Sequence, residues 1–107
     1  MKVRNILAML IDQIKALASD IRMQMLEWLK DPEGNFPPQG HDAPKEIGIC
    51  MTHLQHKAAL SASSTSSHLA ILQQAGLVEA TRIGKWTYFR RNEAAIAAFA
   101  EQLKREL

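Results

Sequence analysis

The strongest structural signals of the chain lie in residues 60–91, LSASSTSSHLAILQQAGLVEATRIGKWTYFRR. The first half of this stretch predicts a helix with two marked ends. Ser61 begins the helix, because a serine hydroxyl accepts a hydrogen bond from the unpaired N–H groups of a first turn. Gly76 ends it, because glycine readily takes the left-handed conformation of a C-cap. Side chains that would face a core recur between these ends at helical spacing: Thr65, Leu69 and Leu72, with Leu77 just beyond.

The opposite face of this helix is small, polar and free of negative charge; it carries Ser63, Ser64, Ser66, Ser67 and His68. A serine-rich run such as SASSTSS at 61–67 is more often a flexible linker, but a linker does not carry leucines at helical spacing on both sides. Residues 78–81 and 86–90 are rich in β-branched and aromatic residues and are joined through RIGK at 82–85, a pattern typical of a hairpin. Helix, cap and basic-tipped hairpin, in this order, predict a winged helix-turn-helix.

The N-terminal half predicts two helices and a long connection. Apolar residues at helical spacing predict an amphipathic helix over residues 3–17. Ser19 starts a second helix that ends near Lys30, because the proline of Asp31-Pro32 disfavours helix in the residue before it. Residues 31–46 hold all four prolines and two of the five glycines, so they predict a long Pro/Gly loop that is either functional or disordered.

The C-terminal half completes a single domain of residues 1–107. A helix over about 52–58 precedes the helix that starts after Ser61, and the two form a helix-turn-helix of residues 52–75. Residues 78–91 form the wing. Asn92 caps a last helix over 92–107, which carries one apolar stripe. The predicted fold is therefore mostly α with a β-hairpin wing, in the order α-α-α-α-β-β-α.

Charge is distributed unevenly although the net charge is only +2. Residues 47–78 contain no Asp or Glu, and the hairpin carries four cations against the single carboxylate of Glu79: Arg82, Lys85, Arg90 and Arg91. A basic surface without acids favours a polyanionic partner. The apolar run at 6–11 is too short for a signal peptide and is followed by Asp12, and no stretch approaches the length of a membrane span, so we expect a cytoplasmic protein without a membrane partner.

Several blocks of the chain resemble the ArsR/SmtB repressors. The run LSASSTSSHLAILQQAGLV at 60–78, with RIGKWTY at 82–88, resembles the family segment L-S-x-S-x-x-S-x-H-L-x-x-L-x-x-A-G-L-V followed by R-x-G-x-x-x-Y. Upstream, ALAS at 16–19 with Arg22 and Met25-Leu26 is similar to the family's entry into its second helix. The resemblance covers nearly the whole chain except residues 31–46, where the better-known members have a short connection.

The resemblance implies a homodimeric, sequence-specific repressor that binds double-stranded operator DNA. The helix after Ser61 would enter the major groove, which admits an α-helix, and Ala62 stands where the family often has a base-reading Gln. The expected DNA-binding residues are Ala62, Ser63, Ser66, Ser67, His68, Arg82 and Lys85. The first and last helices would form the dimer interface, through Leu10, Ile14, Ile96, Phe99 and Leu103.

Neither metal site that the family implies is intact. One site needs two cysteines at the positions of Cys50 and Thr52, and the other needs Asp and His ligands in the last helix, which has neither. We therefore expect no metal and no cofactor, and a release signal of another kind, such as thiol oxidation or a small molecule. Cys50, His53 and His56 at three-residue spacing leave a metal-responsive repressor open as an alternative, which His41 and Asp42 would join only if the loop folds back.

Cys50 itself has two interpretations. A free cysteine is commonly a small buried hydrophobe, whereas a position just before a helix N-terminus favours the thiolate and a redox-sensing role. An enzyme is not expected, because the chain has no G-x-S-x-G elbow, no Gly-rich phosphate loop and no H-E-x-x-H. A winged-helix module for protein contacts is a further alternative, against which the acid-free face and the basic wing argue.

Overall fold

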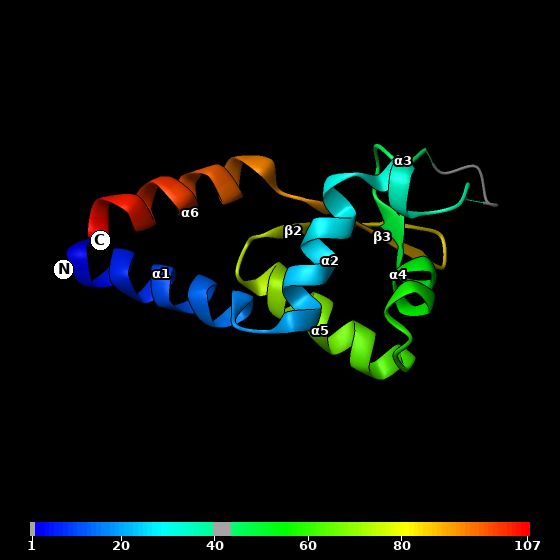
Figure 1. The fold of residues 1–107 in the computed structure, drawn as a ribbon, viewed down its shortest axis with the longest axis horizontal. Coiled ribbons are helices and arrows are strands. Elements are labelled where there is room, and N and C mark those ends of the chain that lie inside the picture. The colour runs from blue at the N-terminus through cyan, green and yellow to red at the C-terminus, as the bar shows by residue number, and fades with distance from the viewer. Residues whose placement is uncertain (1, 40–43) are drawn as a thin grey trace.

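A computed structural model describes residues 2–39 and 44–107. Along the chain it has α1 (Lys2–Leu17), α2 (Asp20–Lys30), α3 (Pro32–Asn35), β1 (Ile49–Cys50), α4 (Met51–Ala58), α5 (Ala62–Gln74), β2 (Val78–Ile83), β3 (Trp86–Arg91) and α6 (Glu93–Glu106). Helices α1 and α6 lie side by side as an arm, with both termini at its tip, and the other elements form a head at its base (Figure 1). The mostly helical fold with a hairpin wing is confirmed.

Three predicted helix starts are set by side-chain caps. The Ser19 hydroxyl accepts a hydrogen bond from the Arg22 N–H at 3.3 Å, and the Asn92 side chain accepts one from the Ala95 N–H at 3.0 Å. At the start of α5 the Ser61 hydroxyl accepts from the Ser64 N–H at 3.1 Å. Each cap satisfies an N–H group that has no partner inside its own helix. The helix boundaries predicted from these residues are therefore confirmed.

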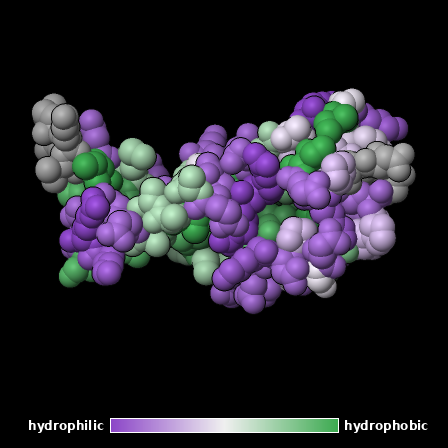
Figure 2. Space-filling model, turned by 90° about the horizontal axis from the view of Figure 1, so that it is seen from above, coloured by the Kyte–Doolittle hydropathy of each residue, from purple (hydrophilic) through white to green (hydrophobic). Residues whose placement is uncertain are grey.

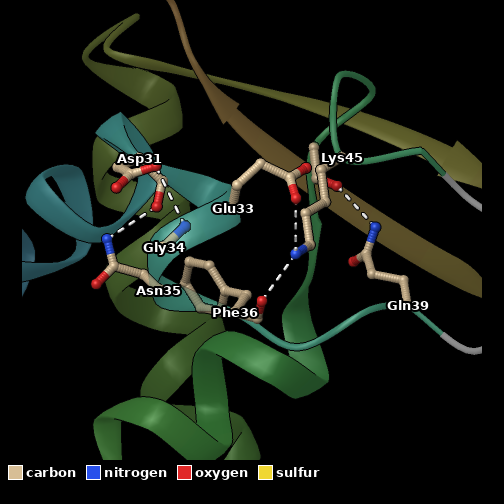
Figure 3. A network of polar contacts seen from close by, with 8 residues as sticks. Asp31, Glu33, Gly34, Asn35, Phe36, Gln39 and Lys45 are labelled. Atoms are coloured by element: carbon tan, nitrogen blue, oxygen red, sulfur yellow. Dashed lines mark hydrogen bonds and ion pairs between the residues drawn. The ribbon is translucent and has the colours of Figure 1, made fainter.

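The connection predicted as a loop over 31–46 is partly helical, which corrects the predicted order of elements. Asp31 ends α2 and also caps α3, since its side chain accepts from the Gly34 N–H at 3.2 Å (Figure 3). Asn35 donates from Nδ2 to the carbonyls of Asp31 and Trp28, at 2.9 and 3.2 Å. Phe36, which follows, is 5% exposed and packs in the core. Pro32 thus starts a short helix at its favoured first position instead of opening a loop.

Hydrogen bonds join the later part of this connection to the chain around β1. The Gln39 amide donates to the Gly48 carbonyl at 3.1 Å and accepts from the Cys50 N–H at 2.8 Å. The Lys45 ammonium donates to the Phe36 carbonyl at 2.7 Å and lies 3.5 Å from a Glu33 carboxylate oxygen (Figure 3). The described ends of the connection are therefore held by specific polar contacts. His41 and Asp42, considered above as ligands, lie outside the described residues.

The sheet contains a strand that the sequence did not predict. Strand β1 pairs antiparallel with β3, with Ile49 opposite Phe89 and Cys50 opposite Tyr88, and gives the order β1-β3-β2. The hairpin is longer than predicted: β2 runs through Arg82 to Ile83, so only Gly84 and Lys85 lie between the strands. Gly84 has φ +60, the conformation that such a tight turn requires.

The core lies in the head, between α2, α4, α5 and the sheet. Its fully enclosed side chains include Met25, Ile49, Leu54, Leu69 and Leu72. Thr65 is also fully buried, and its hydroxyl donates to the Ser61 carbonyl at 2.9 Å, so its polar atom has a partner. Among the described residues, no helix combines the length and the apolar character needed to cross a bilayer.

Candidate nucleic-acid interface

The helix-turn-helix is built by α4 and α5 around a tight turn. Ala59 takes the left-handed conformation with φ +55, and its N–H donates to the His56 carbonyl at 3.2 Å. The turn redirects the chain so that Ser61 caps α5 directly. Because Thr65, Leu69 and Leu72 anchor the inner face of α5 in the core, its outer face is fixed relative to the head. This is the geometry that presents a helix to a groove.

Four of the five predicted residues on α5 lie on its exposed face: Ala62, Ser63, Ser66 and Ser67. Short side chains at these positions let the backbone approach a partner closely. Their hydroxyls can donate to phosphate oxygens and can donate to or accept from base edges. With no acidic residue between 47 and 78, nothing on this segment repels a phosphate.

His68, the fifth predicted residue, is half-buried and has a partner within the protein. Its Nδ1 lies 2.9 Å from Nη1 of Arg22 on α2. Nε of the same guanidinium donates to the Ala16 carbonyl at 2.6 Å, and Nη2 donates to the Lys15 carbonyl at 3.4 Å. Sequence patterns predicted no role for Arg22 beyond the family resemblance. Since Arg22 and His68 are 46 positions apart, no local pattern could have revealed the contact.

The four cations of the hairpin fall into two kinds. Arg90 lies 3.3 Å from a Glu79 oxygen, and Arg91 lies 2.8 Å from a Glu93 oxygen, so both are neutralised locally. Arg82 and Lys85 are exposed and, within the part of the chain that the structure describes, form no ion pair. Arg82 donates from Nε to the Gly84 carbonyl at 3.1 Å, and the Lys85 ammonium lies 5.3 Å from the centre of the Trp86 ring. The two predicted wing residues are therefore the hairpin cations whose charge remains for a partner.

Cys50 is enclosed. It is 2% exposed, stands in β1 opposite Tyr88 and directly precedes α4. Burial raises the pKa of the Tyr88 hydroxyl above its ordinary value, and the neighbouring Cys50 raises it further. His53 is half-buried and His56 is exposed. In residues 2–39 and 44–107, no three His, Cys, Asp or Glu side chains are arranged to hold a metal ion, so Cys50, His53 and His56 are not brought together as a site.

The residues predicted for the dimer interface lie on the arm. Leu10 is 5% exposed and is already covered within one chain, whereas Ile14 is 42% exposed. Ile96, Phe99 and Leu103 are half-buried on α6, and the first two line a groove of about 420 Å³ between α6 and α2. Other large apolar side chains of α1 are also exposed, namely Ile6, Leu7, Met9 and Ile11. Apolar residues thus reach the surface along the arm, on the left of Figure 2.

A helix-turn-helix with an exposed serine face beside a cationic wing defines the class of winged helix-turn-helix DNA-binding domains. No protein-family model matches the chain. The chain is 41% identical over 97 residues to the uncharacterized HTH-type transcriptional regulator YbzH of Bacillus subtilis, an alignment that covers 91% of this chain and 97% of that protein.

Two examples come from the solved structures that share the fold. One is the homodimeric winged helix-turn-helix DNA-binding domain of a possible ArsR-family transcriptional regulator from Mycobacterium bovis, with TM-score 0.68 and 24% identity over 96% of this chain and 83% of that one. The other is an ArsR-like transcriptional regulator from Rhodococcus sp. RHA1, with TM-score 0.65 and 24% identity over 92% and 78% of the two chains. The chain belongs to the HTH-type transcriptional regulators, and it shares its winged helix-turn-helix fold with regulators of the ArsR family. Its relatives are DNA-binding regulators, a class without enzymatic activity.

Proposed function

We propose that the chain is a homodimeric repressor that binds operator DNA through the outer face of α5 and the tip of the wing, and that a signal other than a metal ion releases it. The single observation that supports this most is the exposed face of α5, made of Ala62, Ser63, Ser66 and Ser67, on a segment without acids. Arg82 and Lys85 at the wing tip add two exposed cations. Together these residues offer hydroxyls for groove contacts and positive charges for phosphates.

Two routes are open to a release signal that is not a metal ion. Cys50 is the single thiol of the chain, and because the residue is 2% exposed, an oxidant would reach it only when the structure around it opens. Oxidation would then place polar oxygen atoms in an enclosed site and disturb the start of α4. A small molecule bound elsewhere is the other non-metal route. A metal-responsive repressor lacks support from the geometry of Cys50, His53 and His56.

Operator binding tests the role of α5. The native protein is used to select its preferred duplex from a random pool, and affinity is then measured for that duplex and for a scrambled one. Ser66→Glu and Ser67→Glu should each lose most of the affinity for the selected duplex, because a carboxylate on this face repels phosphate. Glu101→Ala, on the exposed part of α6, is the control and should bind as the native protein does. Native-like binding by both glutamate variants would exclude α5 as the reading helix, that is, the helix that contacts base edges in the major groove.

The same assay separates the wing from α5. Arg82→Ala and Lys85→Ala should weaken binding to both duplexes and lower the slope of log affinity against log salt by about 0.9 for each phosphate that the variant no longer neutralises. Arg105→Ala removes an exposed cation from α6 and should leave the slope unchanged. A protein-interaction module would show no salt-dependent binding to either duplex. If Arg82→Ala or Lys85→Ala altered the base preference but left the slope unchanged, the wing would contact bases instead of phosphates.

A further inference from the structure

A chain of hydrogen bonds runs from the base of the arm to the outer helix of the helix-turn-helix. Arg22 donates to the Ala16 and Lys15 carbonyls, at 2.6 and 3.4 Å, and its Nη1 lies 2.9 Å from Nδ1 of His68. The two carbonyls belong to the last turn of α1, where backbone acceptors have no partner within the helix. A guanidinium at this end also complements the negative pole of the helix. One side chain of α2 therefore joins the end of α1 to the middle of α5.

The chemistry of the contact fixes the state of the histidine ring. A guanidinium has five donors and no acceptor, so Nδ1 of His68 must be the acceptor. The ring proton then lies on Nε2, which points away from Arg22 because the two nitrogens diverge across the ring. Arg22 thereby leaves His68 with one N–H donor on the side of the ring away from Arg22, a group that can bond a phosphate oxygen or an acceptor on a base.

Packing between α5 and α1 is incomplete. A cleft of about 410 Å³ lies between the two helices and is lined by Asp12, Lys15, Ala16, Arg22, Ile71, Gln74 and Ala75. Ile71 at this cleft is 40% exposed, so apolar side chains do not close it. A second polar link lies at the far end, where the Gln13 amide donates to the Ala75 carbonyl at a long 3.5 Å. Of these two links, the shorter bonds of Arg22 are the stronger connection across the cleft.

We propose that Arg22 is a positioning residue for DNA recognition: it holds His68 as a single tautomer and sets the placement of α5 from the end of α1. The inference rests on the proposed role of α5 as the reading helix and adds a residue that lies on another helix. Its alternative is a plain electrostatic role, in which Arg22 only adds one positive charge near the DNA. The two roles predict different effects of a substitution that keeps the charge.

Arg22→Lys keeps the charge but replaces the planar fork with three donors on one ammonium nitrogen, which cannot reproduce the separate positions of Nε at the Ala16 carbonyl and Nη1 at His68. We expect about a tenfold loss in the ratio of affinities for the selected and scrambled duplexes, with an unchanged salt slope. Arg105→Lys on α6 is the matched control and should change neither quantity. In a His68→Ala background, Arg22→Lys should have little further effect on the ratio, because both changes act through one contact. A native ratio for Arg22→Lys, or additive effects of the two changes, would overturn the proposal.

Nitrogen NMR of the imidazole rings gives a readout that is independent of DNA. In the native protein His68 should show the Nε2–H tautomer, and Arg22→Lys should show a mixture of both tautomers while circular dichroism and sedimentation remain native. An Nε2–H signal that persists unchanged in Arg22→Lys would refute the positioning role. If the native protein prefers no DNA sequence, the proposed function fails, and this spectrum alone decides whether Arg22 holds His68.

Discussion

Cys50 illustrates how burial decides the behaviour of a single residue. Cys50 is 2% exposed in β1, and its backbone N–H donates to the side-chain oxygen of Gln39 at 2.8 Å. We therefore expect the native protein to react slowly with a thiol reagent, at a rate that rises with denaturant as the structure opens. Cys50→Ser should lower the free energy of unfolding by about 1–3 kcal/mol, because it buries a hydroxyl without an arranged partner. Rapid, complete labelling in native buffer would contradict the enclosed site and support a redox sensor.

Glu93 gives a prediction about pH. Hydrogen bonds from Arg91, at 2.8 and 3.1 Å, lower the pKa of the Glu93 carboxyl below its ordinary value of 4.5, with further help from the charges of Arg91 and Lys30. A carboxyl whose pKa is lower in the folded state stabilises the fold above its unfolded pKa. That stabilisation disappears as pH falls through the folded pKa.

The substitution Glu93→Gln tests this sign. At neutral pH it should lower the free energy of unfolding by about 0.2–1 kcal/mol, a small effect because the Glu93 side chain is 68% exposed and screened by solvent. The difference between the two proteins should shrink as pH falls below 4.5, the ordinary pKa of the carboxyl, and vanish below the lowered pKa of the folded state. Chemical denaturation at several pH values measures it. A difference that persists unchanged into acid would show that the charge of Glu93 is not its source.

At the scale of elements, Gly48 decides whether β1 can form. It has φ +138, and a Cβ built there would lie 2.7 Å from the Phe89 carbonyl oxygen of β3. Any other residue at this position is excluded by the positive φ and by the contact of its Cβ with the Phe89 backbone. Gly48→Ala should detach β1, lower the free energy of unfolding by several kcal/mol and expose Cys50 to a thiol reagent. Gly84→Ala is a useful comparison, because Gly84 also has positive φ but no described atom lies within 4 Å of the added carbon; it should cost about 1 kcal/mol.

The sequence predicted the elements whose signals are local. Ser19, Ser61 and Asn92 mark their helices through hydrogen bonds that span three residues. Strand β1 has only two residues and exists because Phe89 and Tyr88, far along the chain, pair with it. The short helix α3 needed Asp31 and Asn35 to outweigh the proline-rich composition around it. Such contacts carry no periodic signal, so composition alone predicted a loop.

In the candidate interface, too, some features could be predicted from the sequence and others could not. Its exposed serine face follows from the helical period of the buried Thr65, Leu69 and Leu72. The difference between Arg82 and the ion-paired Arg90 needed the register of the hairpin, which brings Glu79 opposite Arg90. The contact of Arg22 with His68 needed the packing of α2 against α5. Surface patterns were therefore predictable, whereas side-chain partners were not.

In the molecule as a whole, the arm formed by α1 and α6 exposes apolar side chains that a partner would cover. The described structure measures 47 Å along its long axis and 25 Å across, because α1 and α6 extend from the head as a pair (Figure 1). Two helices cannot enclose the apolar residues of α1, of which Ile11 and Ile14 remain 49% and 42% exposed. A second copy packed along the arm would bury these faces and place two reading helices on one duplex, as palindromic half-sites require.

Ile14 on α1 tests whether this face of the arm is the dimer interface. Ile14→Glu places a charge on the arm face that a partner would cover, so it should convert the dimer to a monomer by sedimentation while circular dichroism remains native. Phe99→Asp should do the same, but it also removes packing beside Ile96, so Ile14→Glu is the cleaner variant. Ile83→Glu in the wing, which replaces a side chain of similar exposure at 46%, is the control and should stay dimeric.

Loss of the dimer should also be visible on DNA. In a dimer, binding of one head holds the second head at a high effective concentration near its own half-site. A monomer lacks this gain, so affinity for the selected duplex should fall roughly 100-fold or more. Binding to a duplex that carries a single half-site should be nearly the same for Ile14→Glu and the native protein, because α5 and the wing are untouched. A dimeric Ile14→Glu would move the interface away from this face of α1. A monomer with undiminished affinity would instead show that one head suffices for recognition, and that the arm serves stability alone.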